Sequence, residues 1–237
     1  MKKVVALLLI MLPLLAFSQE PLFQPRQMPN PVNFLPPYPA PGSAAFDYDQ
    51  AQYRWGKEQR NNPQRKEIAV RDAVWGVSTI CQEFSEPFGL QITPDGTPAI
   101  YRLLSVGLAS TDQVGKITKE HYNRTRPYIF FHEPTIVPGD EEELSHNGSY
   151  PSGHTILGWS AALLLTELNP ERADTILARG YMYGESRVIA GFHWQSDVDA
   201  GRLAASAAVA RLHADPRFQK LMKQARREFQ KKYKGKN

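Results

Sequence analysis

The chain has 237 residues, 42% of them hydrophobic, and a formal charge of +4, to which Lys2 and Lys3 contribute two. This length suits one well-buried domain, and the nearly neutral remainder gives no general reason to expect nucleic acid as a partner. A single cysteine, Cys81, excludes an internal disulfide framework, and we expect it to be a small buried hydrophobe.

The first eighteen residues, MKKVVALLLIMLPLLAFS, have the pattern of a secretory signal peptide. Two lysines precede an uncharged apolar stretch, and Ala16 and Ser18 provide small residues ahead of a cut before Gln19. The alternative is a membrane anchor, but the run is short for a span and Pro13 interrupts it. We therefore expect residues 1–18 to be a signal peptide and the mature protein to be periplasmic, with no membrane span after cleavage.

Eight prolines crowd residues 20–42, so this segment cannot form a helix. We expect the proline-rich segment 19–44 to lie extended over the body of the protein or to remain partly disordered. Packing across a neighbouring subunit is one role that such a segment could have.

Helical patterns dominate from about residue 45 onward, and strand signals are almost absent. The apolar spacing and the stop signals predict helices over 45–60, 66–84, 93–125 (one helix or two in series), 152–168, 171–189, about 195–213, and from 216. We therefore predict an all-α fold with a single compact helical domain over 45–237. Its basic C-terminal tail is expected to be a solvated helix that frays rather than a nucleic-acid site.

The stretch NGSYPSGHT, residues 147–155, is an unusual way to begin an apolar helix. Ser152 is a good N-cap, and Gly153 has no side chain to keep a ligand from the backbone. The free N–H groups of the first turn and the helix dipole favour an anion, beside which His154 would lie. Taken alone, this stretch fits an ordinary turn with a surface histidine equally well.

The segment KEHYNRTRP contains Lys119 and Arg126 among its basic residues. Lys119 and Arg126 are seven residues apart, so that on a helix both emerge on one face. Pro127 biases Arg126 out of the helical region and is expected to fix the end of the helix. A solvated basic helix end is the simpler interpretation of this segment alone.

The segment SRVIAGFHWQSD contains a third group of polar residues. Arg187 lies in an otherwise apolar helix, Gly191 breaks that helix, and His193 stands in the connection. Asp197, near the start of the next helix, can accept a hydrogen bond from one ring nitrogen of His193 and leave the other free to act. A capping Asp beside a buried, satisfied His is the alternative.

Two histidines and one carboxylate raise the question of a metal site. The same segments bring three fixed positive charges, on Lys119, Arg126 and Arg187, which would repel a divalent cation and match a tetrahedral oxyanion. Charge matching favours the anion, and we expect no metal and no cofactor.

These three segments, in this order and spacing, resemble the signature of the type 2 phosphatidic acid phosphatase superfamily, which also contains the vanadium haloperoxidases. Within it, GSYPSGHT and SRVIAGFHWQSDVDAGR are most similar to the class A bacterial non-specific acid phosphatases, which are secreted, soluble and metal-independent. The resemblance covers roughly residues 70–230.

The resemblance implies a role for each residue of the motifs. It implies that five residues hold the phosphoryl oxygens: Lys119, Arg126, Ser152, Gly153 and Arg187. His193 would attack phosphorus and form a phosphohistidine, with Asp197 holding its far nitrogen. His154 would protonate the leaving alcohol and then activate the water that releases phosphate.

The resulting hypothesis is an exported acid phosphatase that hydrolyses many phosphomonoesters, with some phosphotransferase activity to alcohols. Its partners would be small phosphomonoesters and inorganic phosphate, and we expect a homodimer. A vanadium haloperoxidase is a second hypothesis, opposed by the short chain and tested by peroxide-dependent halide oxidation. An exported phosphate-binding protein is a third, opposed by the presence of His154, His193 and Asp197.

Overall fold

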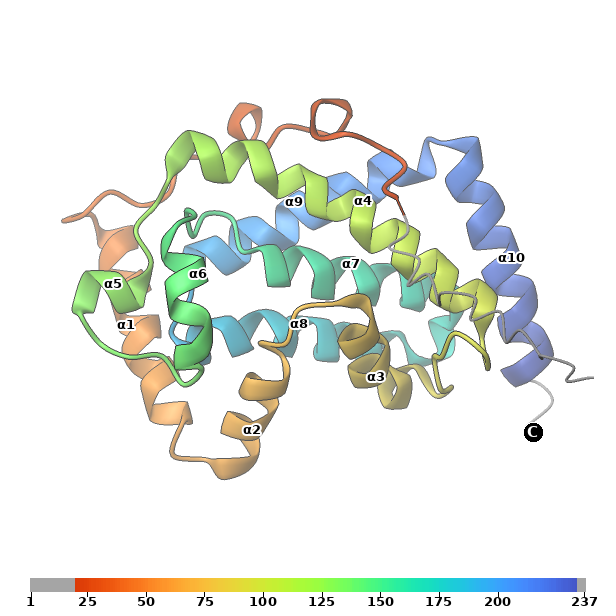
Figure 1. Cartoon of the computed structure of the whole chain (residues 1–237), viewed down its shortest axis with the longest axis horizontal. Coiled ribbons are helices and arrows are strands. Elements are labelled where there is room, and N and C mark those ends of the chain that lie inside the picture. Colours follow the sequence, from red (N-terminus) through yellow and green to blue (C-terminus); the bar gives the residue numbers. More distant parts are fainter. Residues whose placement is uncertain (1–19, 234–237) are drawn as a thin grey trace, which may run out of the picture.

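The computed structural model describes residues 20–233, so the predicted signal peptide lies outside the described residues. Within that range every long element is a helix, and the prediction of a single all-α domain is confirmed (Figure 1). The α-helices are α1 (Ala44–Gln59), α2 (Pro63–Arg71), α3 (Val77–Phe88), α4 (Pro98–Tyr122), α5 (Pro127–Phe131), α6 (Glu141–Ser145), α7 (Gly153–Leu168), α8 (Ala173–Ala190), α9 (Gln195–His213) and α10 (Pro216–Tyr233). Four short 3-10 turns accompany them: η1 (Pro25–Gln27) and η2 (Pro31–Asn33) precede α1, η3 (Pro138–Asp140) lies between α5 and α6, and η4 (Pro170–Arg172) lies between α7 and α8.

Helix α7 forms the centre of the domain, in contact with α4, α8 and α9 (Figure 1). Its sequence, GHTILGWSAALLLTEL, is apolar on nearly every face, as a helix covered from several sides requires. Glycines let α7 and α8 approach closely, because a Cβ atom at Gly180 would lie 2.5 Å from the Cβ of Ala162. Since the two helices run in opposite directions, the start of α7 and the end of α8 lie at the same end of the domain.

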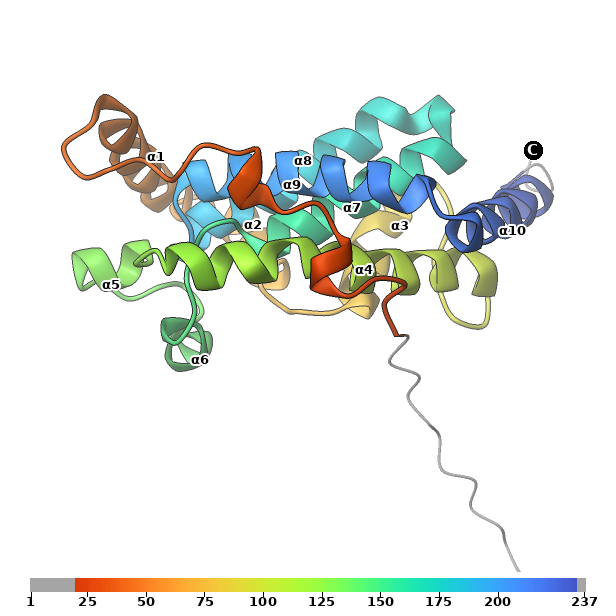
Figure 2. The ribbon, with the colours of Figure 1, turned by 90° about the horizontal axis from the view of Figure 1, so that it is seen from above.

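The proline-rich segment packs over the body of its own chain, which is one of the two outcomes foreseen from the sequence (Figure 2). Phe23 and Met28 belong to the main hydrophobic core, and η1 and η2 contact α4. Near the end of the segment, the Tyr38 ring packs edge-on against the Tyr122 ring at a centroid distance of 5.8 Å. The prolines therefore exclude an α-helix but allow two 3-10 turns and an ordered path.

The single helix predicted over 66–84 is wrong, because the chain turns between α2 and α3. Asp72, at the end of α2, is fully buried and accepts hydrogen bonds from Arg179 and from the Ser186 hydroxyl on α8. Gly76 then adopts φ 141, a conformation open to glycine, directly before α3. Contacts with residues more than one hundred positions away thus override the helical spacing of this stretch.

The helical stretch predicted over 93–125 also ends earlier than expected. Helix α4 stops at Tyr122, and Asn123 caps it in the left-handed conformation with φ 39. Arg126 is the extended residue ahead of Pro127, with φ −75 and ψ 153, and it precedes α5. Lys119 and Arg126 are therefore not two turns apart on one helix, although both reach the same cavity.

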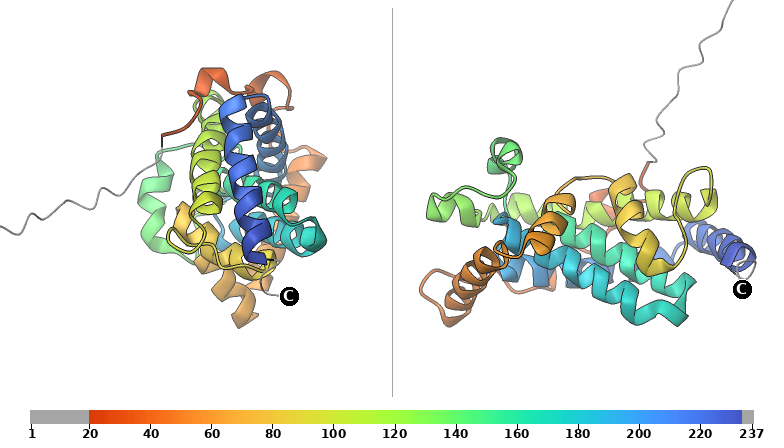
Figure 3. Two further views of the ribbon diagram at one scale, coloured as in Figure 1. Left: turned by 90° about the vertical axis from the view of Figure 1, so that its right-hand side faces the viewer. Right: turned by 90° about the horizontal axis from the view of Figure 1, so that it is seen from below.

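The basic C-terminal segment forms α10, an amphipathic helix packed beside α4 rather than a solvated, fraying one (Figure 3). Its apolar face buries Phe218, Leu221, Met222, Ala225 and Phe229. The Glu228 carboxylate accepts hydrogen bonds of 3.0 Å from the backbone N–H groups of Ala99 and Ile100, in the first turn of α4. None of the helices in residues 20–233 combines the length and the apolar character that a membrane crossing requires.

Candidate active site

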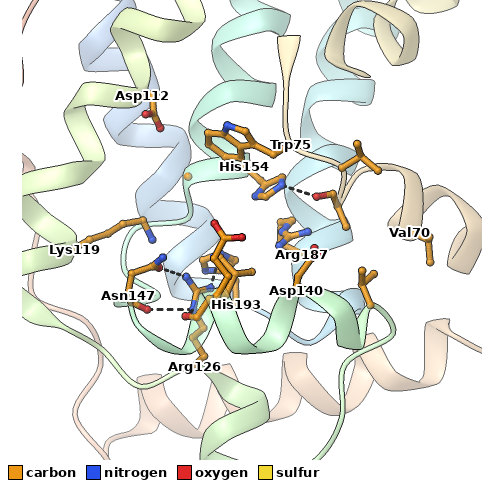
Figure 4. A pocket seen from close by; sticks show the side chains of 16 residues that line it. Val70, Trp75, Asp112, Lys119, Arg126, Asp140, Asn147, His154, Arg187 and His193 are labelled. Carbon is orange, nitrogen blue, oxygen red and sulfur yellow. Dashed lines mark hydrogen bonds between the residues drawn. The ribbon is translucent and has the colours of Figure 1, made fainter. Parts of the chain in front are cut away.

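A cavity of about 540 Å³ opens at the end of the domain where α7 begins and α8 ends (Figure 4). Six of the eight residues proposed from the sequence line it: Lys119, Arg126, Gly153, His154, Arg187 and His193. The other two, Ser152 and Asp197, are fully buried and adjoin the cavity through residues that line it. The structure thus brings all three sequence segments together.

Arg187, in the last turn of α8, is the most unusual group in the cavity. Its side chain is fully buried, and none of its three guanidinium nitrogens has a hydrogen-bond partner among residues 20–233. The Phe192 ring covers the guanidinium at 4.7 Å. Burial, followed by the charge of Arg126, lowers the pKa of Arg187 to about 10, so it stays charged near neutral pH. A buried cation without acceptors is costly unless an anion binds there.

Arg126 is held by the loop that precedes α7. Its Nε donates to the carbonyl of Leu144 at 2.8 Å, and its Nη2 donates to the side-chain oxygen of Asn147. Its Nη1 lies 3.2 Å from Nε2 of His193. Because a guanidinium can only donate, Nε2 of His193 accepts this bond with its lone pair, and both residues line the cavity.

Lys119 reaches the cavity from the last turn of α4, where its Nζ donates to the carbonyl of Gly148 at 2.7 Å. Desolvation in the cavity, followed by the charge of Arg126, lowers the pKa of this lysine to about 7. Its ammonium group is therefore lost as the pH rises through neutrality. An anion bound beside it would favour the charged form.

His193 and Asp197 are arranged as the sequence predicts. Gly191 ends α8 in the left-handed conformation with φ 94, and Asp197 lies in the first turn of α9. The Asp197 carboxylate accepts from Nδ1 of His193 at 3.3 Å and from the backbone N–H of Trp194 at 2.9 Å. Burial and the charges of Arg126 and Lys119 lower the pKa of His193 well below its ordinary value. The imidazole is thus neutral, with a proton on Nδ1 and an electron pair on Nε2 that accepts from Arg126.

A buried ion network that the sequence analysis missed lies behind Asp197. Arg124 donates to Asp197 at 2.5 Å and to Asp49 of α1 at 2.7 Å. Asp49 is itself fully buried and accepts from the N–H and the hydroxyl of Ser196, at 2.8 and 2.6 Å. Arg124 stands two residues before Arg126 in RTRP, but no spacing rule could distinguish this structural arginine from the one that faces the cavity.

His154, in the first turn of α7, has one ring nitrogen engaged with the backbone. Its Nε2 lies 3.0 Å from the carbonyl oxygen of Ala73, which accepts the proton of this nitrogen. Nδ1 is therefore the nitrogen available to a ligand. Burial, followed by the charge of Arg187, lowers the pKa of His154 well below its ordinary value. The Ala73 carbonyl is a second contributor that sequence reasoning missed, because it depends on the break between α2 and α3.

Ser152 and Gly153 occupy the positions expected of an N-cap and of an open first turn. The Ser152 oxygen accepts from the Thr155 N–H at 3.4 Å and from the Thr155 hydroxyl at 2.9 Å. A Cβ atom at Gly153 would lie 3.9 Å from Cε of Lys119 and 3.6 Å from the Trp75 ring, so a side chain here would narrow the cavity. The backbone of the first turn of α7 is thus accessible to a ligand.

The cavity is lined by groups of both charges. Three carboxylates, those of Asp112, Asp140 and Glu143, line it together with Lys119, Arg126 and Arg187. The charge of Asp112 acts to raise the pKa of Lys119, and that of Asp140 acts to raise the pKa of Arg187, although burial lowers both pKa values overall. Across residues 20–233, no group of three or more His, Cys, Asp and Glu side chains is arranged to hold a metal ion. The Lys and Arg donors that line the cavity are of the kind that binds a tetrahedral oxyanion.

Comparison with protein families matches residues 100–219 to the PAP2 superfamily. A non-specific acid phosphatase of Providencia stuartii is 48% identical over 198 residues, which cover 83% of this chain and 79% of the relative. The chain belongs to the PAP2 superfamily. A non-specific acid phosphatase of Salmonella typhimurium is 40% identical over 218 residues (92% and 87% covered), and an acid phosphatase of Zymomonas mobilis is 36% identical over 203 residues (85% and 76%).

Within the PAP2 superfamily, the chain groups with the non-specific acid phosphatases, and the resemblance drawn from its motifs is confirmed. The match to the family covers α4 to the start of α10, and thus every motif residue. Asp49 and Ala73 lie outside that match, in α1 and in the turn after α2. The eight motif residues thus all lie in the PAP2 region, and the N-terminal part of the chain adds further contacts to the site.

Proposed function

We propose that this protein is an exported acid phosphatase that hydrolyses a broad range of phosphomonoesters through a phosphohistidine on His193. Its place among the acid phosphatases supports hydrolysis of phosphomonoesters. The observation that carries the proposal is the fully buried guanidinium of Arg187, which has no partner among the described residues and shares its cavity with His193 and His154. The N-terminal sequence MKKVVALLLIMLPLLAFS supports export to the periplasm.

In the first step, the phosphoryl oxygens accept from Lys119, Arg126 and Arg187, with the Gly153 N–H and the Ser152 hydroxyl as further donors. The electron pair on Nε2 of His193 forms a bond to phosphorus while the bond from phosphorus to the ester oxygen breaks. His154 gives the proton on Nδ1 to that oxygen. Preorganised donors around the three equatorial oxygens supply most of the rate enhancement in such transfers.

Protonation of His154 depends on the substrate. In the free cavity burial and Arg187 keep this imidazole neutral. A bound phosphoryl group adds negative charge beside it and favours the imidazolium. The proton required by the leaving oxygen is therefore available when the ester enters as a monoanion, so we expect activity to be highest on the acidic side of neutrality.

In the second step, a water molecule attacks the phosphohistidine while His154 accepts its proton. The bond between nitrogen and phosphorus breaks, and inorganic phosphate leaves. An alcohol that enters in place of water takes the phosphoryl group instead, so the same intermediate supports phosphotransferase activity.

The test is hydrolysis of p-nitrophenyl phosphate at mildly acidic pH in excess EDTA, by the purified protein and by His193→Ala. His121→Ala, an exposed histidine near the end of α4, is the matched control. Turnover that persists in EDTA, is retained in the control and is lost in His193→Ala supports the proposal. Activity that EDTA abolishes, or that His193→Ala retains, contradicts the metal-free phosphohistidine route.

A further inference from the structure

The direction in which the ester group leaves follows from the two histidines. His193 and His154 approach the cavity from different sides, with Arg187 beside the space between them (Figure 4). Attacking and leaving atoms lie roughly in line in phosphoryl transfer, so attack by His193 moves the leaving oxygen toward His154. The remainder of the leaving group then lies against whatever surrounds His154.

An apolar wall surrounds His154 on that side. The Trp75 ring stands edge-on to the imidazole, with a centroid distance of 4.8 Å and an interplanar angle of 78°. Trp75 is 53% exposed, and Val74 and Val70 beside it are also exposed. All three side chains line the cavity. Large apolar side chains that are exposed together at a cavity are typical of a surface that binds a ligand.

The turn between α2 and α3 places this wall relative to the proton donor. Ala73 supplies the carbonyl that fixes the His154 tautomer, and Trp75 follows two residues later. Asp72 anchors the same turn through its buried contacts with Arg179 and Ser186 on α8. These buried contacts fix the backbone of the turn that carries Trp75. A fixed backbone positions the indole for stacking against a ligand.

The lining residues of the cavity also include three carboxylates. Asp112, on α4, and Asp140 and Glu143, before and in α6, line the cavity. In Figure 4, Asp140 lies near Arg187, whereas Asp112 lies on the opposite side of His154, on α4. If Lys119, Arg126 and Arg187 bind the phosphoryl group, the three carboxylates are the charged groups of the cavity that are left to meet a second negative charge on the substrate, and they disfavour it.

We propose that Trp75 forms, with Val70 and Val74, a leaving-group subsite for planar aromatic groups that carry no further negative charge. This inference rests on the proposed phosphatase function. An aromatic ring attached next to the ester oxygen stacks on the indole once the phosphoryl group is in place, while a saturated ring of the same size makes only edge contacts. Trp75 is thus a specificity-determining residue.

The experiment compares benzyl phosphate with cyclohexylmethyl phosphate, two primary esters with the same carbon framework, in wild type, Trp75→Ala and Trp75→Leu. Tyr48→Ala is the matched control, because Tyr48 is 55% exposed and lies on α1 outside the cavity. We expect both Trp75 variants to lower kcat/KM for benzyl phosphate about tenfold, mostly through KM, as the loss of a stacking contact predicts. For cyclohexylmethyl phosphate the expected fall is at most about threefold in Trp75→Ala, since its contacts are weaker.

A second measurement tests the charge of the subsite. We expect wild type to have a higher kcat/KM for benzyl phosphate than for 4-carboxybenzyl phosphate. Glu143→Gln should reduce the ratio of these two values about two- to fivefold, the range of an exposed charge interaction. Equal losses on both substrates in the Trp75 variants, or a loss confined to kcat, would assign the indole to supporting His154 and overturn the subsite. If wild type hydrolyses both esters and the ratio of their kcat/KM values stays the same in every variant, the subsite is overturned and the phosphatase function stands. If wild type hydrolyses neither ester, the proposed function is overturned as well.

Discussion

Replacing Lys119 with arginine should change how the affinity for oxyanions depends on pH. Desolvation lowers the pKa of Lys119 to about 7, whereas the buried guanidinium groups of Arg126 and Arg187 keep pKa values of about 10. The lysine therefore loses its charge as the pH rises through neutrality, and an arginine at this position keeps it. The substitution preserves a donor to the oxyanion and removes the titration.

The size of the effect follows from the pKa. At about pH 8.5 a group with a pKa of about 7 is only about 3% protonated, against about 90% at pH 6, so binding that requires the charge weakens about 30-fold. A pKa near 10 gives almost no change over the same interval. Wild type should therefore lose about 30-fold more affinity than Lys119→Arg between these two pH values.

The assay is competitive inhibition by sulfate, a tetrahedral oxyanion that stays dianionic throughout this range. The logarithm of Ki is followed against pH in wild type, in Lys119→Arg and in Lys116→Arg, a control one turn earlier on α4 whose side chain is half exposed. Proton uptake by the histidines affects all three proteins alike, so the difference between the curves isolates Lys119. Parallel curves for wild type and Lys119→Arg would refute the titration of this lysine.

Two further substitutions test the buried arginines. Arg187→Met should raise the free energy of unfolding by about 1–2 kcal/mol, because it removes a buried charge without a partner, as a thermal melt measures. Phosphate at about 100 times its Kd should stabilise wild type by about 2.7 kcal/mol and this variant hardly at all, and equal protection would contradict an oxyanion role for Arg187. Asp49→Asn should lower the free energy of unfolding by about 3 kcal/mol and lower kcat more than it changes KM, because Arg124 is then paired with Asp197 alone. The control is Asp47→Asn, at an exposed position on the same helix. A KM effect without a kcat effect would argue against positioning through Asp197.

Much of the site could be predicted from the sequence because its motifs follow local rules. The N-cap at Ser152 and the glycine stop at Gly191 are fixed by neighbouring residues, and the structure places both as predicted. The spacing from His193 to Asp197 then brings ring and carboxylate together across one helix start. The roles of these residues in the reaction stay predictions.

What the sequence could not supply depends on distant contacts. The spacing of 66–84 fits one helix, and only burial of Asp72 against Arg179 shows why the chain turns there. The proline-rich segment offers no periodicity, yet Phe23 and Met28 enter the core. In both cases a tertiary contact decides between conformations that local propensity leaves nearly equal.

The contrast between Arg124 and Arg187 shows how the fold separates structural charge from functional charge. Both guanidinium groups are buried, but Arg124 is neutralised by Asp49 and Asp197, while Arg187 has no hydrogen-bond partner among residues 20–233. A pair that is already satisfied gains nothing from a ligand, and an unsatisfied cation gains most from an oxyanion. The stability sacrificed at Arg187 is therefore recovered only on binding, which concentrates affinity for the phosphoryl group where His193 can attack it.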